Sequence, residues 1–264
     1  MSFKGATAAV AVLMSALAVG QAGSAFAADG YIAKAAAPDT QAILPAPPKA
    51  DSGTQADDRA AFTASRSLEG SSRWALAVND VEQSPEAAFL DFACALGVTL
   101  DDGKAPVLSS LLNRIRTDAR WAVDPPKDHY ARHRPYVDQP GNICVEKTSA
   151  LAASASYPSG HSTLSWAWGL ILAELAPDRA TQILTRARVY AESRVVCGVH
   201  FPSDIEAGRA NGSILVAALH SSPEFRADMD KARAEVEAAR KAAGVTPDPG
   251  QCKVEAEAAA TRPW

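Results

Sequence analysis

The sequence predicts an all-α fold, a single-domain helical bundle, and three observations support this prediction. Apolar residues recur at three- and four-residue steps over long segments, which is the spacing of one face of an α-helix. The alternation of Val, Ile and Thr that is typical of strands is nearly absent. The chain has 264 residues, of which 47% are hydrophobic, so it is long enough to bury one large core.

Eight segments carry the helical pattern. They are residues 57–68, 72–81, 84–96, 105–121, 159–175, 178–195, 203–219 and 223–243. Segments 124–147 and 196–202 have poor helix signals and are predicted to be loops that hold functional groups. We place the domain at residues 57–245, followed by a C-terminal tail, 246–264, in which Pro247, Pro249 and Gly250 around Cys252 predict an irregular segment tied by that cysteine.

The N-terminal end has the features of a secretory signal over residues 1–27. Lys4 provides a positive start, residues 8–19 are mostly apolar, and residues 25–27 form a small-x-small cleavage site. A membrane anchor is the alternative, but Gly20 and Gly23 interrupt the apolar run before it reaches the roughly 20 residues that span a bilayer. We therefore expect an exported protein, free of the membrane after cleavage, that starts near Ala28 with an extended Pro/Ala-rich arm over residues 28–56.

Charge and cysteine content narrow the choice of partner and compartment. The formal net charge of −4 becomes −5 when the signal and its Lys4 are removed, which argues against a nucleic-acid partner because such proteins need a basic face. Four cysteines remain in the mature chain: Cys94, Cys144, Cys197 and Cys252. Export favours their pairing in one of three connectivities, and their separations match no compact zinc-ligand spacing.

A helix start at Pro158-Ser159-Gly160 is a candidate anion site. An apolar helical pattern follows it directly, so free backbone N–H groups and the positive end of the helix dipole meet there. Taken alone, Ser159 is more simply interpreted as an ordinary helix cap.

Three cations are candidates for binding a phosphoryl group. Lys127 and Arg134 lie in a segment that its prolines predict to be extended, and Arg194 lies at the end of a predicted helix. Isolated basic residues are usually solvated, but planar Arg groups together with Lys are the usual means of stabilising a phosphoryl transition state without a metal. No metal or other cofactor is therefore predicted.

Two histidines are candidates for acid–base and nucleophilic chemistry. His200 and Asp204 are four residues apart, with Pro202 at the predicted start of a helix, so the carboxylate can orient one imidazole nitrogen while the other faces a substrate. His161 follows the helix start at Ser159 and Gly160. A buried structural histidine is the alternative for each, but two imidazoles in different surroundings can divide the roles of nucleophile and acid.

The order and spacing of these residues resemble a known family signature. The three parts are Lys127-x6-Arg134-Pro135, Pro158-Ser159-Gly160-His161 and Ser193-Arg194-x5-His200-x3-Asp204, separated by 22 and 31 residues. This pattern is similar to that of the type 2 phosphatidic acid phosphatase and vanadium haloperoxidase superfamily. The flanks at 43–45, 127–130, 156–161 and 193–198 resemble the class A bacterial non-specific acid phosphatases, and the resemblance runs from about Ile43 to near Ala243.

The resemblance implies a soluble periplasmic phosphatase that acts on small-molecule phosphate monoesters through a phosphohistidine, and it suggests a homodimer. It implies that His200 is the nucleophile, Asp204 orients it, and His161 is the acid for the leaving group. It assigns phosphate binding to Lys127, Arg134, Ser159, Gly160 and Arg194. This chain departs from the class A pattern at Ala155, Tyr136, Val199, Phe201 and Pro202, which leaves the chemistry intact and bears on substrate preference.

Convergence of the motif segments on one phosphate also predicts a pairing of the cysteines. Cys144 and Cys197 each adjoin such a segment, so we expect them to pair, which leaves Cys94 for Cys252 in the tail.

Three other functions compete with the phosphatase: a vanadate-dependent haloperoxidase, a lipid phosphate hydrolase, and a phosphate-binding protein without turnover. Chain length and the class A flanks argue against a haloperoxidase. The lack of membrane spans argues against a lipid phosphate hydrolase, and the retained histidines argue against a binding protein without turnover.

Overall fold

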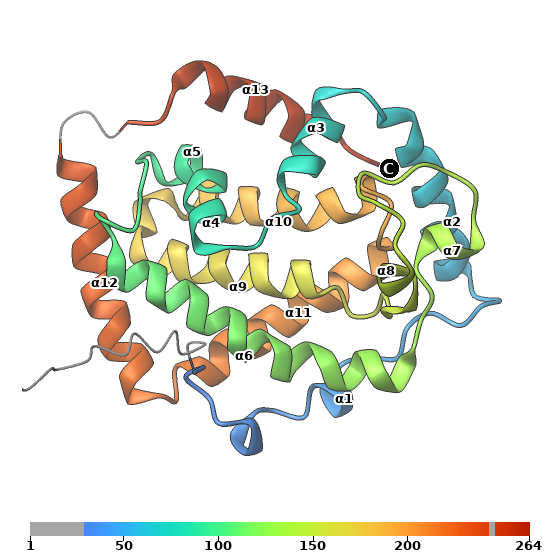
Figure 1. Cartoon of the computed structure of the whole chain (residues 1–264), viewed down its shortest axis with the longest axis horizontal. Coiled ribbons are helices and arrows are strands. Elements are labelled where there is room, and N and C mark those ends of the chain that lie inside the picture. The colour runs from blue at the N-terminus through green and yellow to red at the C-terminus, as the bar shows by residue number, and fades with distance from the viewer. Residues whose placement is uncertain (1–28, 243–245) are drawn as a thin grey trace, which may run out of the picture.

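The structure is a computed structural model that describes residues 29–242 and 246–264. Within these ranges every regular element is a helix, so the all-α prediction is confirmed (Figure 1). None of the helices described is long and apolar enough to cross a membrane. The predicted signal segment, 1–27, lies outside the described residues.

The α-helices are α1 (Thr40–Ile43), α2 (Gly53–Ser65), α3 (Ser72–Asn79), α4 (Pro85–Asp91), α5 (Ala93–Leu96), α6 (Pro106–Tyr130), α7 (Pro135–Asp138), α8 (Ser149–Ala153), α9 (Gly160–Leu175), α10 (Ala180–Val196), α11 (Pro202–Leu219), α12 (Pro223–Lys241) and α13 (Pro249–Ala260). Short 3₁₀ turns occur at Lys34–Ala36, Arg66–Leu68 and Pro177–Arg179. The predicted helices at 159–175, 178–195, 203–219 and 223–243 are confirmed with small shifts at their ends. The segment predicted as one helix at 84–96 is divided at Phe92, where the backbone leaves the helical conformation.

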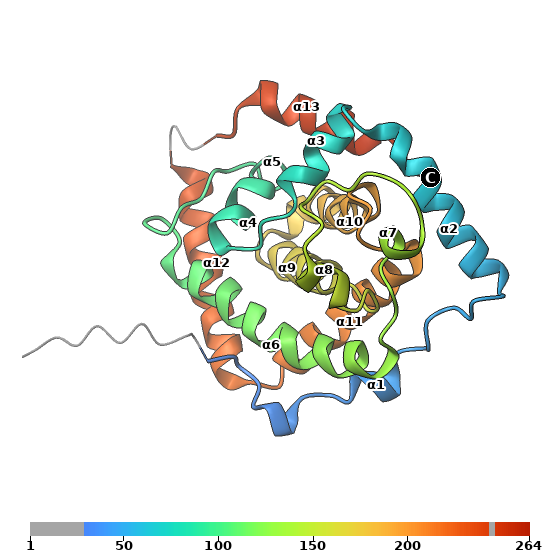
Figure 2. The same ribbon diagram turned by 45° about the vertical axis from the view of Figure 1, so that its right-hand side comes forward.

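Helix α9 is the centre of the bundle. It packs on α10, α11, α6 and α12, and Figure 2 shows α9 and α10 enclosed by the other helices. Two glycines permit close approach: a Cβ on Gly169 would lie 2.4 Å from that of Ala187, and a Cβ on Gly208 would lie 2.7 Å from the Ser159 carbonyl oxygen. Because real Cβ atoms do not come so close, glycine at these positions allows α10 and α11 to lie tightly against α9.

Helix α6 differs from the prediction, because it continues to Tyr130 through Pro125 and Pro126. Proline has no N–H, so Pro126 leaves the carbonyl of Ala122 without its helical donor. That carbonyl accepts hydrogen bonds from Thr40 Oγ1 at 2.8 Å and Asn211 Nδ2 at 2.7 Å instead. The prediction of a loop from residue 124 was therefore wrong, and Lys127 lies on the last turn of a helix rather than in an extended segment.

Both ends of the described chain carry more helix than expected. In the arm, α1 interrupts the extended backbone, and Asp118 of α6 accepts hydrogen bonds from the amides of Tyr31 and Ile32. The prediction of an irregular tail was also wrong, whereas its tie through Cys252 is confirmed. Asp248 caps α13 by accepting from the Gly250 amide at 2.8 Å. Pro249, one of the prolines from which an irregular segment was predicted, occupies the first position of α13. Proline is favoured at that position of a helix.

The two disulfides confirm the predicted pairing. Cys144 is bonded to Cys197, and Cys94 to Cys252. The first pair joins the loop after α7 to the end of α10, and the second ties α13 to α5.

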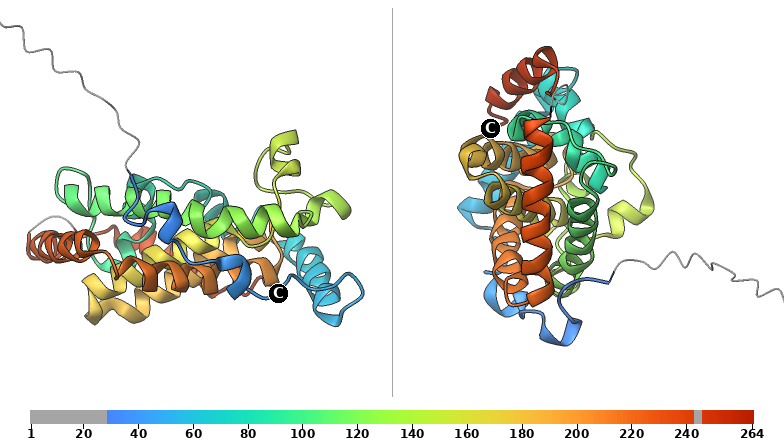
Figure 3. Two further views of the ribbon diagram at one scale, coloured as in Figure 1. Left: turned by 90° about the horizontal axis from the view of Figure 1, so that it is seen from below. Right: turned by 90° about the vertical axis from the view of Figure 1, so that its left-hand side faces the viewer.

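The chain directions bring four helix ends to one end of the bundle. The C-terminal ends of α6 and α10 meet the N-terminal ends of α9 and α11 there, near α8, while α12 covers the opposite end (Figures 1 and 3). The three parts of the sequence motif lie at or beside these four ends.

Candidate active site

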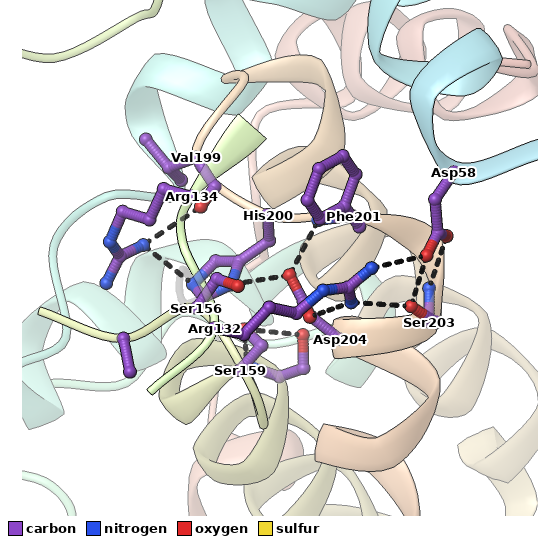
Figure 4. A network of polar contacts seen from close by, with 12 residues as sticks. Asp58, Arg132, Arg134, Ser156, Ser159, Val199, His200, Phe201, Ser203 and Asp204 are labelled. Carbon is purple, nitrogen blue, oxygen red and sulfur yellow. Dashed lines mark hydrogen bonds and ion pairs between the residues drawn. The ribbon is translucent and has the colours of Figure 1, made fainter. Parts of the chain in front are cut away.

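His200 and Asp204 lie at the start of α11 and are buried, with exposed fractions of 2% and 0%. Pro202 occupies the first position of this helix, and the Asp204 carboxylate reaches back to accept a hydrogen bond from the Phe201 amide at 2.8 Å. His200 Nδ1 lies 3.5 Å from Asp204 Oδ2 (Figure 4). The predicted His200–Asp204 contact is therefore present in the structure.

The neighbours of His200 favour one of its tautomers. Arg134 Nη1 lies 3.2 Å from His200 Nε2, and a guanidinium nitrogen can only donate. This contact favours the tautomer in which Nε2 is unprotonated and Nδ1 carries the proton. Nδ1 lies 3.5 Å from Asp204 Oδ2 but has no hydrogen-bond partner among the described residues. A neutral imidazole in this form has its nucleophilic lone pair beside the arginine.

Arg134 and Lys127 are held by carbonyl groups of the segment around α8. Arg134 Nε donates to the carbonyls of Leu151 and Ser154, and its Nη1 also donates to that of Val199. Lys127 Nζ donates to the Ala155 carbonyl. Both cations thus point toward the same end of the bundle as His200, from different elements.

Arg194 and His161 share a second support, the turn after α3. The Arg194 guanidinium is buried, its Nη1 lies 3.4 Å from the Asp80 carbonyl, and its Nε has no hydrogen-bond partner among the described residues. His161 Nε2 lies 3.0 Å from the Val81 carbonyl, so this nitrogen carries a proton and Nδ1 is free to exchange one.

The helix start predicted at Ser159 is also confirmed. Ser159 is the N-cap of α9, and its Oγ accepts from the Ser162 amide at 3.3 Å. Gly160 is the first residue of the helix. The Ser159 amide donates to the Asp204 carbonyl at 3.0 Å, which joins the start of α9 to the start of α11.

Burial makes positive charge unfavourable throughout the site. It lowers the pKa of Lys127 to about 8, an effect that the nearby Arg134 increases, and it lowers the pKa of Arg194 to about 10. The pKa values of His200 and His161 are well below that of free imidazole, first because of burial and then because of the neighbouring arginines. A bound anion would oppose each of these shifts, so the site is electrostatically suited to a phosphoryl group.

Arg132 is a residue of the site to which sequence reasoning assigned no role. It lies within the first motif segment, two residues before Arg134, and pairs with the Asp204 carboxylate (Figure 4). Gln55 and Asp58 of α2 bind its other amino group. The position of Arg132 within the motif could have suggested a role for it in the site. Nothing in the sequence near Arg132 indicated that residues of α2 would be its partners.

Comparison with known proteins identifies the family. The PAP2 superfamily model matches residues 107–228. An acid phosphatase from Zymomonas mobilis subsp. mobilis is 42% identical over 221 residues, 83% of this chain and 83% of that protein. The chain belongs to the acid phosphatases of the PAP2 superfamily.

Further relatives of this acid phosphatase family member cover most of its length. A non-specific acid phosphatase from Providencia stuartii is 34% identical over 207 residues, 78% of this chain and 84% of that protein. Among solved structures, a transmembrane PAP2-type phosphatidylglycerolphosphate phosphatase from Bacillus subtilis covers 70% of this chain and 90% of its own, with a TM-score of 0.48 and 19% identity.

Proposed function

We propose that this acid phosphatase hydrolyses small-molecule phosphate monoesters of broad range through a phosphohistidine on His200, without a metal, in the periplasm. The observation that carries the proposal is the 3.2 Å approach of Arg134 Nη1 to His200 Nε2. This contact favours an unprotonated Nε2, and the charges of Lys127 and Arg194 act on the same ring. The similarity to an acid phosphatase and to a non-specific acid phosphatase supports this activity class. Two disulfides support an oxidising compartment.

The first step transfers the phosphoryl group to the protein. His200 Nε2 attacks phosphorus and forms an N–P bond, while the ester P–O bond breaks and the leaving oxygen takes the proton of His161. Asp204 stabilises the charge that develops on the His200 ring through Nδ1. In the second step water attacks phosphorus, its proton passes to His161, and the N–P bond breaks to release phosphate and neutral His200.

Three cations and a helix N-terminus compensate the charge of the transferring group. Lys127, Arg134 and Arg194 offer N–H donors from different elements, and the amides at the start of α9 offer the positive end of a helix dipole. Preorganised donors of this kind stabilise the equatorial oxygens of a phosphoryl transition state. They supply the charge that a metal supplies in other phosphatases.

The nucleophile is tested by comparing His200→Ala with His161→Ala, with His133→Ala as the control. His133 is an exposed histidine that pairs with Asp138, so its replacement removes an imidazole outside the site. Rapid denaturation in alkaline detergent, which preserves the acid-labile N–P bond, should trap phosphohistidine from a labelled aryl phosphate in the wild type and in the control. It should trap none in His200→Ala, and still trap it in His161→Ala when the leaving group is a nitrophenolate, which needs no proton.

A phosphohistidine in His200→Ala protein would overturn the assignment of the nucleophile. Failure of the wild type to hydrolyse a panel of nucleotides, sugar phosphates and aryl phosphates would overturn the proposed function as a whole. Cell fractionation tests the periplasmic location separately.

A further inference from the structure

A chain of charged groups runs from the surface helix α2 to the nucleophile. We propose that Arg132 and Asp58 are positioning residues for the hydrolysis, because they hold Asp204 as a fixed acceptor and so keep His200 in the tautomer that attacks phosphorus. The inference rests on the proposed function, in which His200 is the nucleophile.

The contacts are specific at every link (Figure 4). Arg132 Nη1 pairs with Asp204 Oδ1 and donates to Ser203 Oγ at 2.7 Å. Arg132 Nη2 donates to Asp58 Oδ2 at 2.8 Å and to Gln55 Oε1 at 2.7 Å. The guanidinium therefore uses both amino groups, each on two acceptors, and its planar shape fixes the direction from which it meets Asp204.

Asp58 also holds the start of α11. Its Oδ1 accepts from the Ser203 amide at 3.0 Å, and its Oδ2 accepts from Ser203 Oγ. The Arg132 guanidinium lies 4.4 Å from the centre of the Phe201 ring, which adds a cation–π contact. Asp58 thus orients Arg132 and the helix that carries Asp204 together.

Burial makes this arrangement necessary. The side chains of Arg132, Asp58 and Asp204 are 9%, 2% and 0% exposed. Burial raises the pKa of Asp204, and the nearby Arg132 is the largest influence in the opposite direction. An isolated carboxylate in such a place would take up a proton.

Several other groups act on Asp204 as well. The charged and titratable groups that face it are Arg132, Lys127, Arg134, His200, Tyr157 and, through Arg132, Asp58. Of the cations, only Arg132 makes a described ion pair with its carboxylate.

The consequence of losing Arg132 follows from the proton on Asp204. A protonated Asp204 no longer favours a proton on His200 Nδ1, so the ring spends less time with Nε2 unprotonated. The groups that bind phosphate are not removed. Replacement of Arg132 should therefore lower kcat about 10- to 100-fold, by analogy with the loss of groups that orient a histidine at metal sites, and should change KM little.

The experiment compares Arg132→Met, Arg132→Lys and Asp58→Asn with the control Arg209→Met. Arg209 lies on the same helix as Asp204 but pairs with Glu206 at the surface. In Arg132→Met the acid limb of the kcat profile should move to higher pH, because the charge that keeps Asp204 ionised is gone. Arg132→Lys should leave the acid limb in place with a smaller loss in kcat, and Asp58→Asn should lower kcat without moving that limb upward.

The control should match the wild type. Wild-type kcat in Arg132→Met, or a loss that is equal at every pH and not relieved by lysine, would refute the inference. If Arg132→Met does not fold, wild-type kcat in both Arg132→Lys and Asp58→Asn would refute it instead. If the wild type forms phosphohistidine but these variants behave like the control, only the inference about Arg132 and Asp58 is contradicted. If the wild type itself is inactive, the proposed function is contradicted.

Discussion

Helix α6 continues through two prolines, and we predict that Thr40 and Asn211 stabilise it there. The Ala122 carbonyl has no helical donor because Pro126 lacks an N–H, and it accepts from Thr40 Oγ1 and Asn211 Nδ2. Thr40→Val and Asn211→Leu each remove one donor with little change in side-chain size. Each single change should lower the free energy of unfolding by about 0.5–1.5 kcal/mol.

The double variant should lose more than the sum of the single losses. Only in the double variant does the buried Ala122 carbonyl lose both side-chain donors, and an unsatisfied buried acceptor costs about 1–3 kcal/mol. We expect a coupling of at least about 1 kcal/mol, which corresponds to roughly 2–4 °C in Tm beyond the summed shifts. The double variant should also lower kcat/KM, because Lys127 lies on the following turn.

Thermal and urea unfolding of the four proteins measure the coupling. Thr63→Val is a suitable control, because Thr63 Oγ1 donates to the Arg59 carbonyl on an exposed part of α2. Losses that add to within about 0.3–0.5 kcal/mol, as for independent sites, would show that the two donors do not serve one carbonyl and that α6 is stabilised in another way.

Three further outcomes follow from the site. Burial, followed by the neighbouring cations, lowers the pKa values of both His200 and His161. His200 therefore stays neutral below the usual imidazole pKa, and His161 holds its proton only at acid pH or beside a bound anion. We expect kcat/KM to peak on the acid side of neutrality, and a maximum above about pH 7.5 would contradict the assigned roles. Activity should survive excess chelator, and loss restored by zinc or magnesium would contradict the metal-free mechanism. Asp80→Asn should lower the free energy of unfolding by about 3 kcal/mol, measured in urea, because buried Arg186 loses its closest charge partner, whereas the exposed-site change Glu237→Gln should have no such effect.

Local sequence was sufficient for the elements whose signals agree with one another. The start of α9 combines the Ser159 cap, a small first residue and a long apolar face, and each of these acts within one or two turns of helix. The start of α11 has Pro202 at its first position, with Asp204 one turn along. Motif order also sufficed to predict that Cys144 and Cys197 meet.

Distant residues decided the elements that the sequence predicted wrongly. Pro125 and Pro126 are helix breakers in isolation, yet α6 continues through them. Thr40 and Asn211, far away in the chain, bind the Ala122 carbonyl that Pro126 leaves without a helical donor. The helix in the tail is likewise held by a disulfide to Cys94 and by an ion pair between Glu255 and Arg186.

The sequence by itself predicted which residues the candidate site contains, since the types and spacing of its cations, histidines and helix starts are local properties. Only the tertiary structure decided which groups support those residues. Arg132 became a partner of Asp204 because α2 brings Asp58 and Gln55 to its other amino group. The physical reason is that buried polar groups must be satisfied wherever the fold places them, and the partners that satisfy them come from any part of the chain.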